Sequence, residues 1–127
     1  MKIESLIQQR NSDLRTLYAQ IIASTKNVQY MSRQTILDIM QEQSAPRFYL
    51  SPYQASLYIL RAYHDNNKNC RKQDMIADLV ENYERLRRLF PEAKKIVLYE
   101  MLVEQPAKSF YLSSKRMREI IFNYTGR

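Results

Sequence analysis

Hydrophobic residues recur at spacings of three and four along most of the chain, which is the pattern of amphipathic α-helices. In the first half this pattern predicts a helix over about residues 3–24. A second helix is expected to begin after the capping residue Ser32 and to end before Pro46, because proline disfavours helical geometry in the residue that precedes it. Ser51 and Gln54 have the spacing of a capping box and predict the start of a third helix.

The second half shows the same plan. A helix is predicted over about residues 71–89, and the next is expected to begin at Pro91 and to end just before Pro106. Ser113 is expected to cap the last helix. The inward residues predicted for these last two helices are Val97, Leu98, Met101 and Leu102, and then Met117, Ile120, Ile121 and Tyr124. About six helices with short connections predict an all-α fold.

The chain contains an internal repeat. Residues 42–51 and 104–113 are identical at seven of ten positions with a constant offset of 62, and residues 10–14 resemble residues 71–75 at an offset of 61. Self-similarity at a fixed period indicates repeated supersecondary structure. We therefore expect a tandem duplication of a three-helix unit, with unit 1 at 1–64, a polar linker at 65–70 and unit 2 at 71–127, packed as one compact domain.

The repeated segment connects the second and third helices of each unit. Phe48 and Phe110 are expected to fill the angle between those helices, and Tyr49 and Tyr111 to place a ring on apolar surface with the hydroxyl in water. The plan of each unit is helix-turn-helix-like, although the connection is longer than the usual three to four residues. The segment is therefore expected to have a structural role, which is to fix the angle between the two helices, rather than to bind a ligand directly.

Residues 105–113 read Gln-Pro-Ala-Lys-Ser-Phe-Tyr-Leu-Ser. This stretch resembles small uncharacterised bacterial proteins in which a Pro-Ala-x-x-Phe-Tyr-(Leu/Val)-(Ser/Thr) segment precedes a short terminal helix. The resemblance covers about thirty residues of each unit and implies no assigned activity. In the first unit Pro46 follows Ala45, whereas Pro106 precedes Ala107, so the two turns are not expected to be identical.

Positive charge is concentrated in the second half. The chain has 20 Lys and Arg against 13 Asp and Glu, a net charge of +7 and a pI near 9.6. Residues 1–66 contain 7 basic and 5 acidic residues, whereas residues 67–127 contain 13 and 8, so the net charges are +2 and +5. In the first predicted helix, Arg10 interrupts the apolar stripe. A basic balance of this size fits a polyanionic partner such as nucleic acid.

The predicted last helix carries the most informative charges. Arg116 and Arg118 lie near its start, where the helix dipole disfavours cations unless a partner supplies anions. We therefore expect a DNA-binding protein, a transcriptional regulator or accessory factor, that binds double-stranded DNA with this helix. The candidate nucleic-acid-binding residues are Ser113, Ser114, Lys115, Arg116, Arg118, Arg87, Arg88, Lys94, Lys95 and Lys108.

A protein-interaction or assembly module is the alternative. In the first unit the corresponding outer face of the third helix is largely apolar and presents Tyr53, Leu57 and Leu60. Such a face is expected to be covered, either by the other unit or by a second subunit. The ten tyrosines of the chain fit an interface, since tyrosine is enriched there. A homodimer would combine both hypotheses, because helical DNA-binding proteins often dimerise.

The composition argues against an enzyme. One Gly excludes a glycine-rich phosphate loop, and one Cys with one His excludes a Cys/His zinc site, so no catalytic residue, cofactor or metal is expected. Asp74 and Asp78 are expected to lie on a solvated helix face rather than to act as a carboxylate pair. We expect no signal peptide and no membrane span, and the lone Cys70 fits the reducing cytoplasm.

Overall fold

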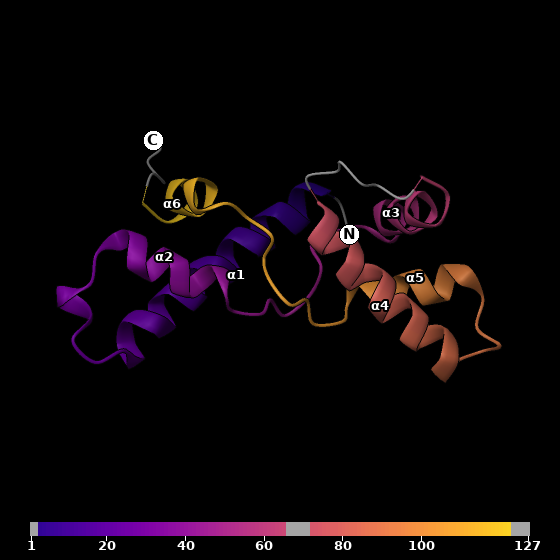
Figure 1. Cartoon of the computed structure of the whole chain (residues 1–127), viewed down its shortest axis with the longest axis horizontal. Coiled ribbons are helices and arrows are strands. Elements are labelled where there is room, and N and C mark those ends of the chain that lie inside the picture. Colours follow the sequence, from indigo (N-terminus) through magenta and orange to yellow (C-terminus); the bar gives the residue numbers. More distant parts are fainter. Residues whose placement is uncertain (1–2, 66–71, 123–127) are drawn as a thin grey trace.

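The computed structural model describes residues 3–65 and 72–122, and these fold into helices (Figure 1). The elements are α1 (Ile3–Ser24), the short 3₁₀ helix η1 (Val28–Tyr30), α2 (Arg33–Gln41), α3 (Pro52–Asp65), α4 (Gln73–Leu89), α5 (Lys95–Val103) and α6 (Ser114–Phe122). The all-α prediction is confirmed. Of the predicted linker at 65–70, Asp65 is the last residue of α3, while residues 66–70 and the predicted core residue Tyr124 lie outside the described residues.

Side-chain caps fix the starts of three helices where the sequence predicted them. The Ser32 hydroxyl accepts from the backbone N–H of Thr35 at 3.1 Å at the start of α2. At α3 the capping box is reciprocal, because the Gln54 N–H donates to Ser51 Oγ at 3.1 Å and the Ser51 N–H donates to Gln54 Oε1 at 3.0 Å. At the start of α6 the Ser113 hydroxyl accepts from the backbone N–H of Arg116 at 3.1 Å.

The start predicted for α5 at Pro91 is wrong. The helix begins at Lys95, after a turn in which the Ala93 N–H donates to the Phe90 carbonyl at 3.1 Å. Residues 95–103 are apolar almost throughout, so the sequence pattern alone does not select one face. Leu98 and Leu102 are buried as predicted, whereas Val97 is exposed and Tyr99 and Val103 are buried in its place.

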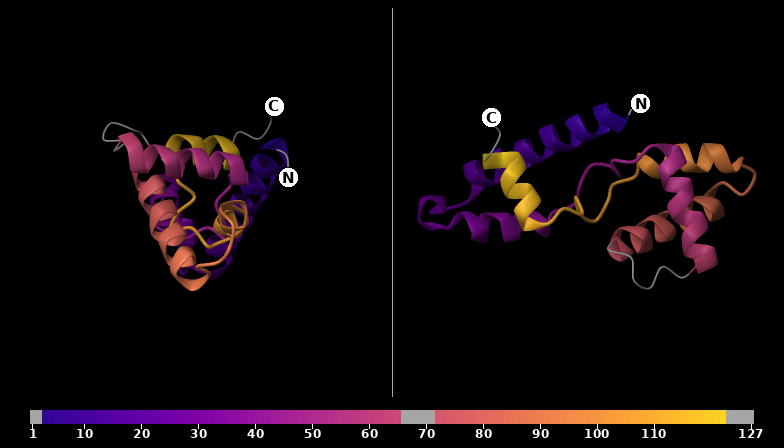
Figure 2. Two further views of the ribbon diagram at one scale, coloured as in Figure 1. Left: turned by 90° about the vertical axis from the view of Figure 1, so that its right-hand side faces the viewer. Right: turned by 90° about the horizontal axis from the view of Figure 1, so that it is seen from above.

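The helices form two groups, and each group takes its third helix from the other half of the chain. Helices α1, α2 and α6 pack together, and α3 packs with α4 and α5. Figure 1 and the right-hand view of Figure 2 show the two groups at opposite ends of the long axis, joined by extended chain. The groups in space therefore differ from the consecutive three-helix units that the repeat predicts.

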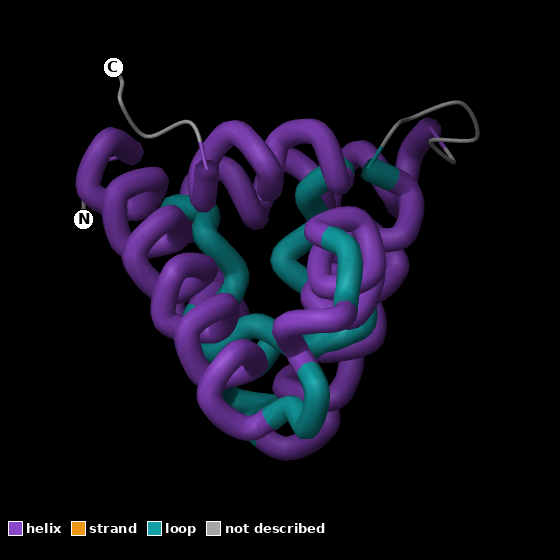
Figure 3. The backbone as a smooth tube through the Cα atoms, turned by 90° about the vertical axis from the view of Figure 1, so that its left-hand side faces the viewer, coloured by secondary structure: helices purple, strands orange, loops and turns teal. Residues whose placement is uncertain are grey.

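Two crossing connectors produce this exchange. Residues 42–51 lead from α2 to α3, and residues 104–113 lead from α5 to α6. They meet in an antiparallel bridge in which the Ala45 N–H donates to the Ala107 carbonyl at 2.9 Å and the Ala107 N–H donates to the Ala45 carbonyl at 3.0 Å. The right-hand view of Figure 2 shows the connectors between the two helix groups, and Figure 3 shows them as loops seen along the long axis. The repeated segments thus pair at equivalent residues, 62 positions apart.

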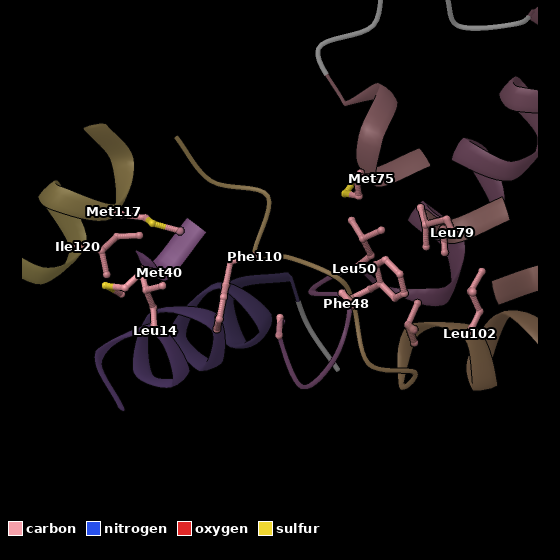
Figure 4. Close-up of a cluster of buried hydrophobic side chains, with 14 of the residues drawn as sticks. Leu14, Met40, Phe48, Leu50, Met75, Leu79, Leu102, Phe110, Met117 and Ile120 are labelled. Carbon is pink, nitrogen blue, oxygen red and sulfur yellow. The ribbon is translucent and has the colours of Figure 1, made fainter. Parts of the chain in front are cut away.

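One continuous core links the two groups through the connectors. Phe48 and Phe110 are buried as predicted and lie between the core residues of the two helix groups, as Figure 4 shows. The rings of Phe110 and Tyr49 stack with centroids 5.8 Å apart. Because the aromatic side chains of the connectors are part of the core, the connectors are packed elements and fix the position of α6 and α3.

Candidate functional site

Helix α6 lies on α1 and α2 and exposes its basic residues. Met117, Ile120 and Ile121 are buried as predicted, which turns Lys115 and Arg118 outward to solvent. Arg116 is also exposed. The amphipathic pattern of α6 therefore creates a solvent-accessible basic surface at one end of the molecule. We call Lys115, Arg116 and Arg118 the α6 basic face.

The contacts of the α6 basic face are few. Arg116 Nη1 lies 3.3 Å from Glu119 Oε1, with both side chains about half exposed. An exposed ion pair of this kind contributes little to stability. Arg118 Nη2 donates to the amide oxygen of Gln34 on α2 at 2.7 Å, so its charge faces a neutral group. One carboxylate therefore offsets part of the positive charge on this face.

The two serines at the start of α6 have structural contacts. Ser113 Oγ accepts from the backbone N–H of Arg116 at 3.1 Å, and the Ser114 hydroxyl donates to Gln41 Oε1 on α2 at 3.3 Å. Ser113 thus occupies one of the donors expected to be available to a phosphate. Its role is to cap α6, and that of Ser114 is to attach α6 to α2.

The other predicted nucleic-acid-binding residues do not join this face. Arg87 and Arg88 end α4, and Lys95 begins α5 after Lys94, so these four lie in the other helix group. Arg87 Nη1 is 3.0 Å from Glu84 Oε1, and Lys108 Nζ is 3.2 Å from Glu81 Oε2. The predicted set is therefore divided between the two ends of the molecule.

The helix-turn-helix-like arrangement is also different from the prediction. The connectors carry α3 and α6 away from the helices that precede them, so α6 packs on α2 rather than on α5. A helix pair with a capped second helix is present in space, but its members come from different halves of the chain. Local sequence signals contain no information about this exchange.

Arg10 is a functional candidate that the sequence analysis did not include. Its guanidinium is half-buried and donates through Nε and Nη2 to Asn11 Oδ1 at 3.1 and 3.0 Å. Burial and the neighbouring positive charge of Arg116 lower the pKa of Arg10. The sequence feature that could have identified Arg10 is its position in the apolar stripe of the first predicted helix. Arg10 brings a second guanidinium close to the α6 basic face.

A cavity of about 200 Å³ lies where the connectors cross. Basic residues from three segments line it: Arg10 of α1, Arg47 of the first connector and Lys72 just before α4. The rings of Tyr49 and Tyr111 complete part of its wall. We call this space the connector cavity. The sequence did not predict it, because it depends on the crossing of two segments that are far apart in the chain.

Each of the two connector tyrosines donates a hydrogen bond to an aspartate, of which Asp13 is half-buried and Asp78 is buried. The Tyr49 hydroxyl donates to Asp13 Oδ2 and the Tyr111 hydroxyl donates to Asp78 Oδ2, both at 2.5 Å. Burial, followed by the aspartate contact, raises the pKa of each tyrosine well above its usual range. Tyr111 has a φ of 56°, a left-handed conformation that is unfavourable for a bulky residue and is concentrated at functional sites.

Asp78 is not on a solvated helix face as predicted. Its side chain is 3% exposed and accepts from the Tyr111 hydroxyl, the Lys108 backbone N–H at 2.8 Å and Asn82 Nδ2 at 2.9 Å. These partners satisfy a buried carboxylate, which explains how a charge is accommodated there. Asp78 and the exposed Asp74 therefore do not form a carboxylate pair facing one site.

The apolar outer face of α3 is not covered by the other helix group. Tyr53 is 71% exposed, Leu57 40% and Leu60 45%. Leu60 also lines a groove of about 430 Å³, together with Phe90 after α4 and Tyr99 of α5. Of the two covers expected for this face, the other unit contacts α3 but leaves Tyr53, Leu57 and Leu60 exposed, and a second subunit or partner stays a prediction.

Other chemistry can be assessed for the described ranges 3–65 and 72–122. Within them, no three His, Cys, Asp or Glu side chains are grouped so that they could hold a metal ion. No helix in these ranges is both long and apolar enough to span a bilayer. Comparison with protein-family models, curated proteins and solved structures gives no match for this chain.

Proposed function

We propose that this chain binds double-stranded DNA in the cytoplasm through the α6 basic face, with Arg10 adding to its positive potential. The observation that carries the proposal is that α6 exposes Lys115, Arg116 and Arg118 together, with one carboxylate, Glu119, paired to them. Like charges that face each other raise the free energy of the unbound protein, and a polyanion relieves this cost. A role as a transcriptional regulator or accessory factor fits this binding.

The residues of the α6 basic face have different parts in the proposal. Lys115 and Arg118 are exposed and reach phosphate oxygens or base edges. Arg118 exchanges its bond to the Gln34 amide for a charge-assisted bond to the ligand. Glu119 lowers the positive potential near Arg116, so Arg116 contributes least of the three.

Binding to a labelled DNA duplex tests the proposal. The double variant Lys115→Ala/Arg118→Gln is expected to lose roughly tenfold or more in affinity and to reduce the slope of log affinity against log salt by about two. The matched control Arg88→Gln/Lys94→Ala removes the same charge from the other helix group. Equal losses in both variants would show a general charge effect and reject the assignment to α6. No binding by the wild type at low salt would reject the function.

A second candidate is docking of a protein, either a second copy or another partner, on the apolar face of α3. The exposure of Tyr53, Leu57 and Leu60 favours it, because exposed apolar clusters mark interaction sites. If the chain forms a homodimer, Leu57→Asp is expected to dissociate it in sedimentation experiments. Ile7→Asp on α1 is the control, since Ile7 is similarly exposed at 39%. A monomer at high concentration would exclude the homodimer.

A further inference from the structure

Basic residues line the connector cavity, and Arg47 also lines a neighbouring pocket together with Asp13 and Glu104. Arg10, Arg47 and Lys72 line the connector cavity, and none of the described residues along its wall is Asp or Glu. Asp13 and Asp78 accept hydrogen bonds from the hydroxyls of Tyr49 and Tyr111. The cavity therefore combines three cations with a wall of aromatic and apolar groups.

The two guanidinium groups have neutral partners. Arg10 donates to the side-chain oxygen of Asn11, and Arg47 Nε donates to the Phe48 carbonyl at 3.0 Å. No carboxylate of the described residues lies within 4.0 Å of the charged nitrogens of either one. A guanidinium has five N–H donors in a planar fork that matches oxyanions, so both retain donors for a ligand.

We propose that the connector cavity binds one phosphate group, held by Arg10 and Arg47. The volume of about 200 Å³ is several times the roughly 30 Å³ that a water molecule occupies in the liquid, so a small oxyanion has room. A phosphate monoester carries between one and two negative charges at neutral pH, which suits a site with several cations better than a single carboxylate does. Tyr111, whose backbone is left-handed, forms part of one wall of this site.

The phosphate group has two possible sources. It belongs either to a free phosphorylated small molecule or to the backbone of a nucleic acid that extends from the α6 basic face, since Arg116 lies near Arg10. Both sources use the same chemistry in the cavity. The site shares Arg10 with the proposed DNA-binding face, whereas Arg47 lines the cavity and is not part of that face, so Arg47 variants separate the two proposals.

Titration with inorganic phosphate at constant ionic strength, followed by calorimetry and by ³¹P line broadening, tests the site. Wild type is expected to bind saturably, and Arg10→Met and Arg47→Met to weaken binding about tenfold or more. The matched controls are Arg15→Met, which changes an exposed position of α1, and Lys108→Met in the second connector. Arg47→Lys keeps the charge and is expected to recover part of the affinity. Circular dichroism checks that each variant is folded.

A parallel titration with duplex DNA distinguishes the sources. Saturable phosphate binding by a chain that does not bind DNA supports a small-molecule ligand and rejects only the proposed function. A loss of DNA affinity in Arg47→Met but not in Lys108→Met, without saturable phosphate binding, assigns the site to a backbone phosphate. Absence of saturable phosphate binding, together with equal DNA affinity of Arg47→Met and Lys108→Met, would overturn the proposal.

Discussion

At the scale of single residues, Tyr49 and Tyr111 reveal the relation between the two halves of the chain. They occupy equivalent places in the repeated segments, and each donates to an aspartate on the first helix of its own half, Asp13 on α1 or Asp78 on α4. These aspartates are 65 positions apart, whereas the sequence match paired Asp13 with Asp74 at an offset of 61. Four residues are slightly more than one helical turn, so both alignments place an acid on a similar face.

Removal of one tyrosine hydroxyl tests this contact. Tyr111→Phe is expected to lower the free energy of unfolding by about 1–3 kcal/mol, because buried Asp78 loses a donor that water cannot easily replace. Urea denaturation measures the change. Tyr53→Phe is the control, since Tyr53 is 71% exposed. A change of less than about 0.5 kcal/mol in Tyr111→Phe would show that the hydrogen bond has little net value.

The same contacts predict sensitivity to alkali. Burial and Asp13 raise the pKa of Tyr49, whereas an unfolded tyrosine titrates near 10. Above pH 10 the unfolded chain therefore releases a proton that the folded chain retains, and stability falls as pH rises. Below pH 10 the contribution is complete. For each such proton the slope is at most about 1.4 kcal/mol per pH unit, and partial exposure reduces it.

Unfolding measured between about pH 9 and 11.5 checks this prediction. The free energy of unfolding is expected to fall less steeply in Tyr49→Phe than in the wild type. Tyr53→Phe is expected to keep the slope of the wild type. Parallel curves for all three proteins would mean that Tyr49 titrates normally in the folded chain.

At the scale of helices, most of the fold was predictable because local signals set helix boundaries. Ser32, Ser51 and Ser113 cap the helices that follow them, as their positions in the sequence predicted. The start of α5 was not predictable from Pro91, since the ring of proline suits a turn as well as a first helical turn. Burial of Asp78 could not be predicted from the sequence either, because two of its hydrogen-bond partners lie 30 or more positions away in the chain.

The capping box of α3 has a measurable effect. Ser51→Ala is expected to destabilise the protein by about 1 kcal/mol, because the Gln54 N–H loses its acceptor at the start of the helix. Thermal and urea denaturation measure it. Ser12→Ala, at an exposed position inside α1, is the control and is expected to be neutral or slightly stabilising. An equal effect at both positions would contradict a capping role.

At the scale of the whole molecule, the hydrophobic periodicity of the sequence could not predict the exchange of α3 and α6. The repeated connectors are identical at seven of ten positions, and each third helix presents a similar apolar face, such as Ala55 and Ile59 in α3 or Met117 and Ile121 in α6. Either third helix therefore satisfies the hydrophobic pattern of either bundle. The crossing at Ala45 and Ala107 determines the choice, and only the structure shows it.

Division of the chain tests this architecture. Fragments 1–65 and 66–127 each contain two helices of one bundle and the third helix of the other. We expect each fragment alone at low concentration to have little stable helix, because isolated short helices are marginal in water and the partner surface is missing. Mixing is expected to restore the helical circular dichroism of the intact chain with a one-to-one stoichiometry.

The fragments also discriminate between the exchanged and the consecutive arrangement. In a consecutive three-helix unit, α3 would pack on α1 and α2, and fragment 1–65 would fold alone as a monomer with cooperative unfolding. In the exchanged arrangement, folding of fragment 1–65 requires a second chain, so its helicity depends on concentration. If fragment 1–65 forms a helical homodimer at high concentration, its α3 can replace α6, which supports the predicted duplication. Cooperative unfolding of a monomeric fragment, independent of concentration, would contradict the exchange of helices.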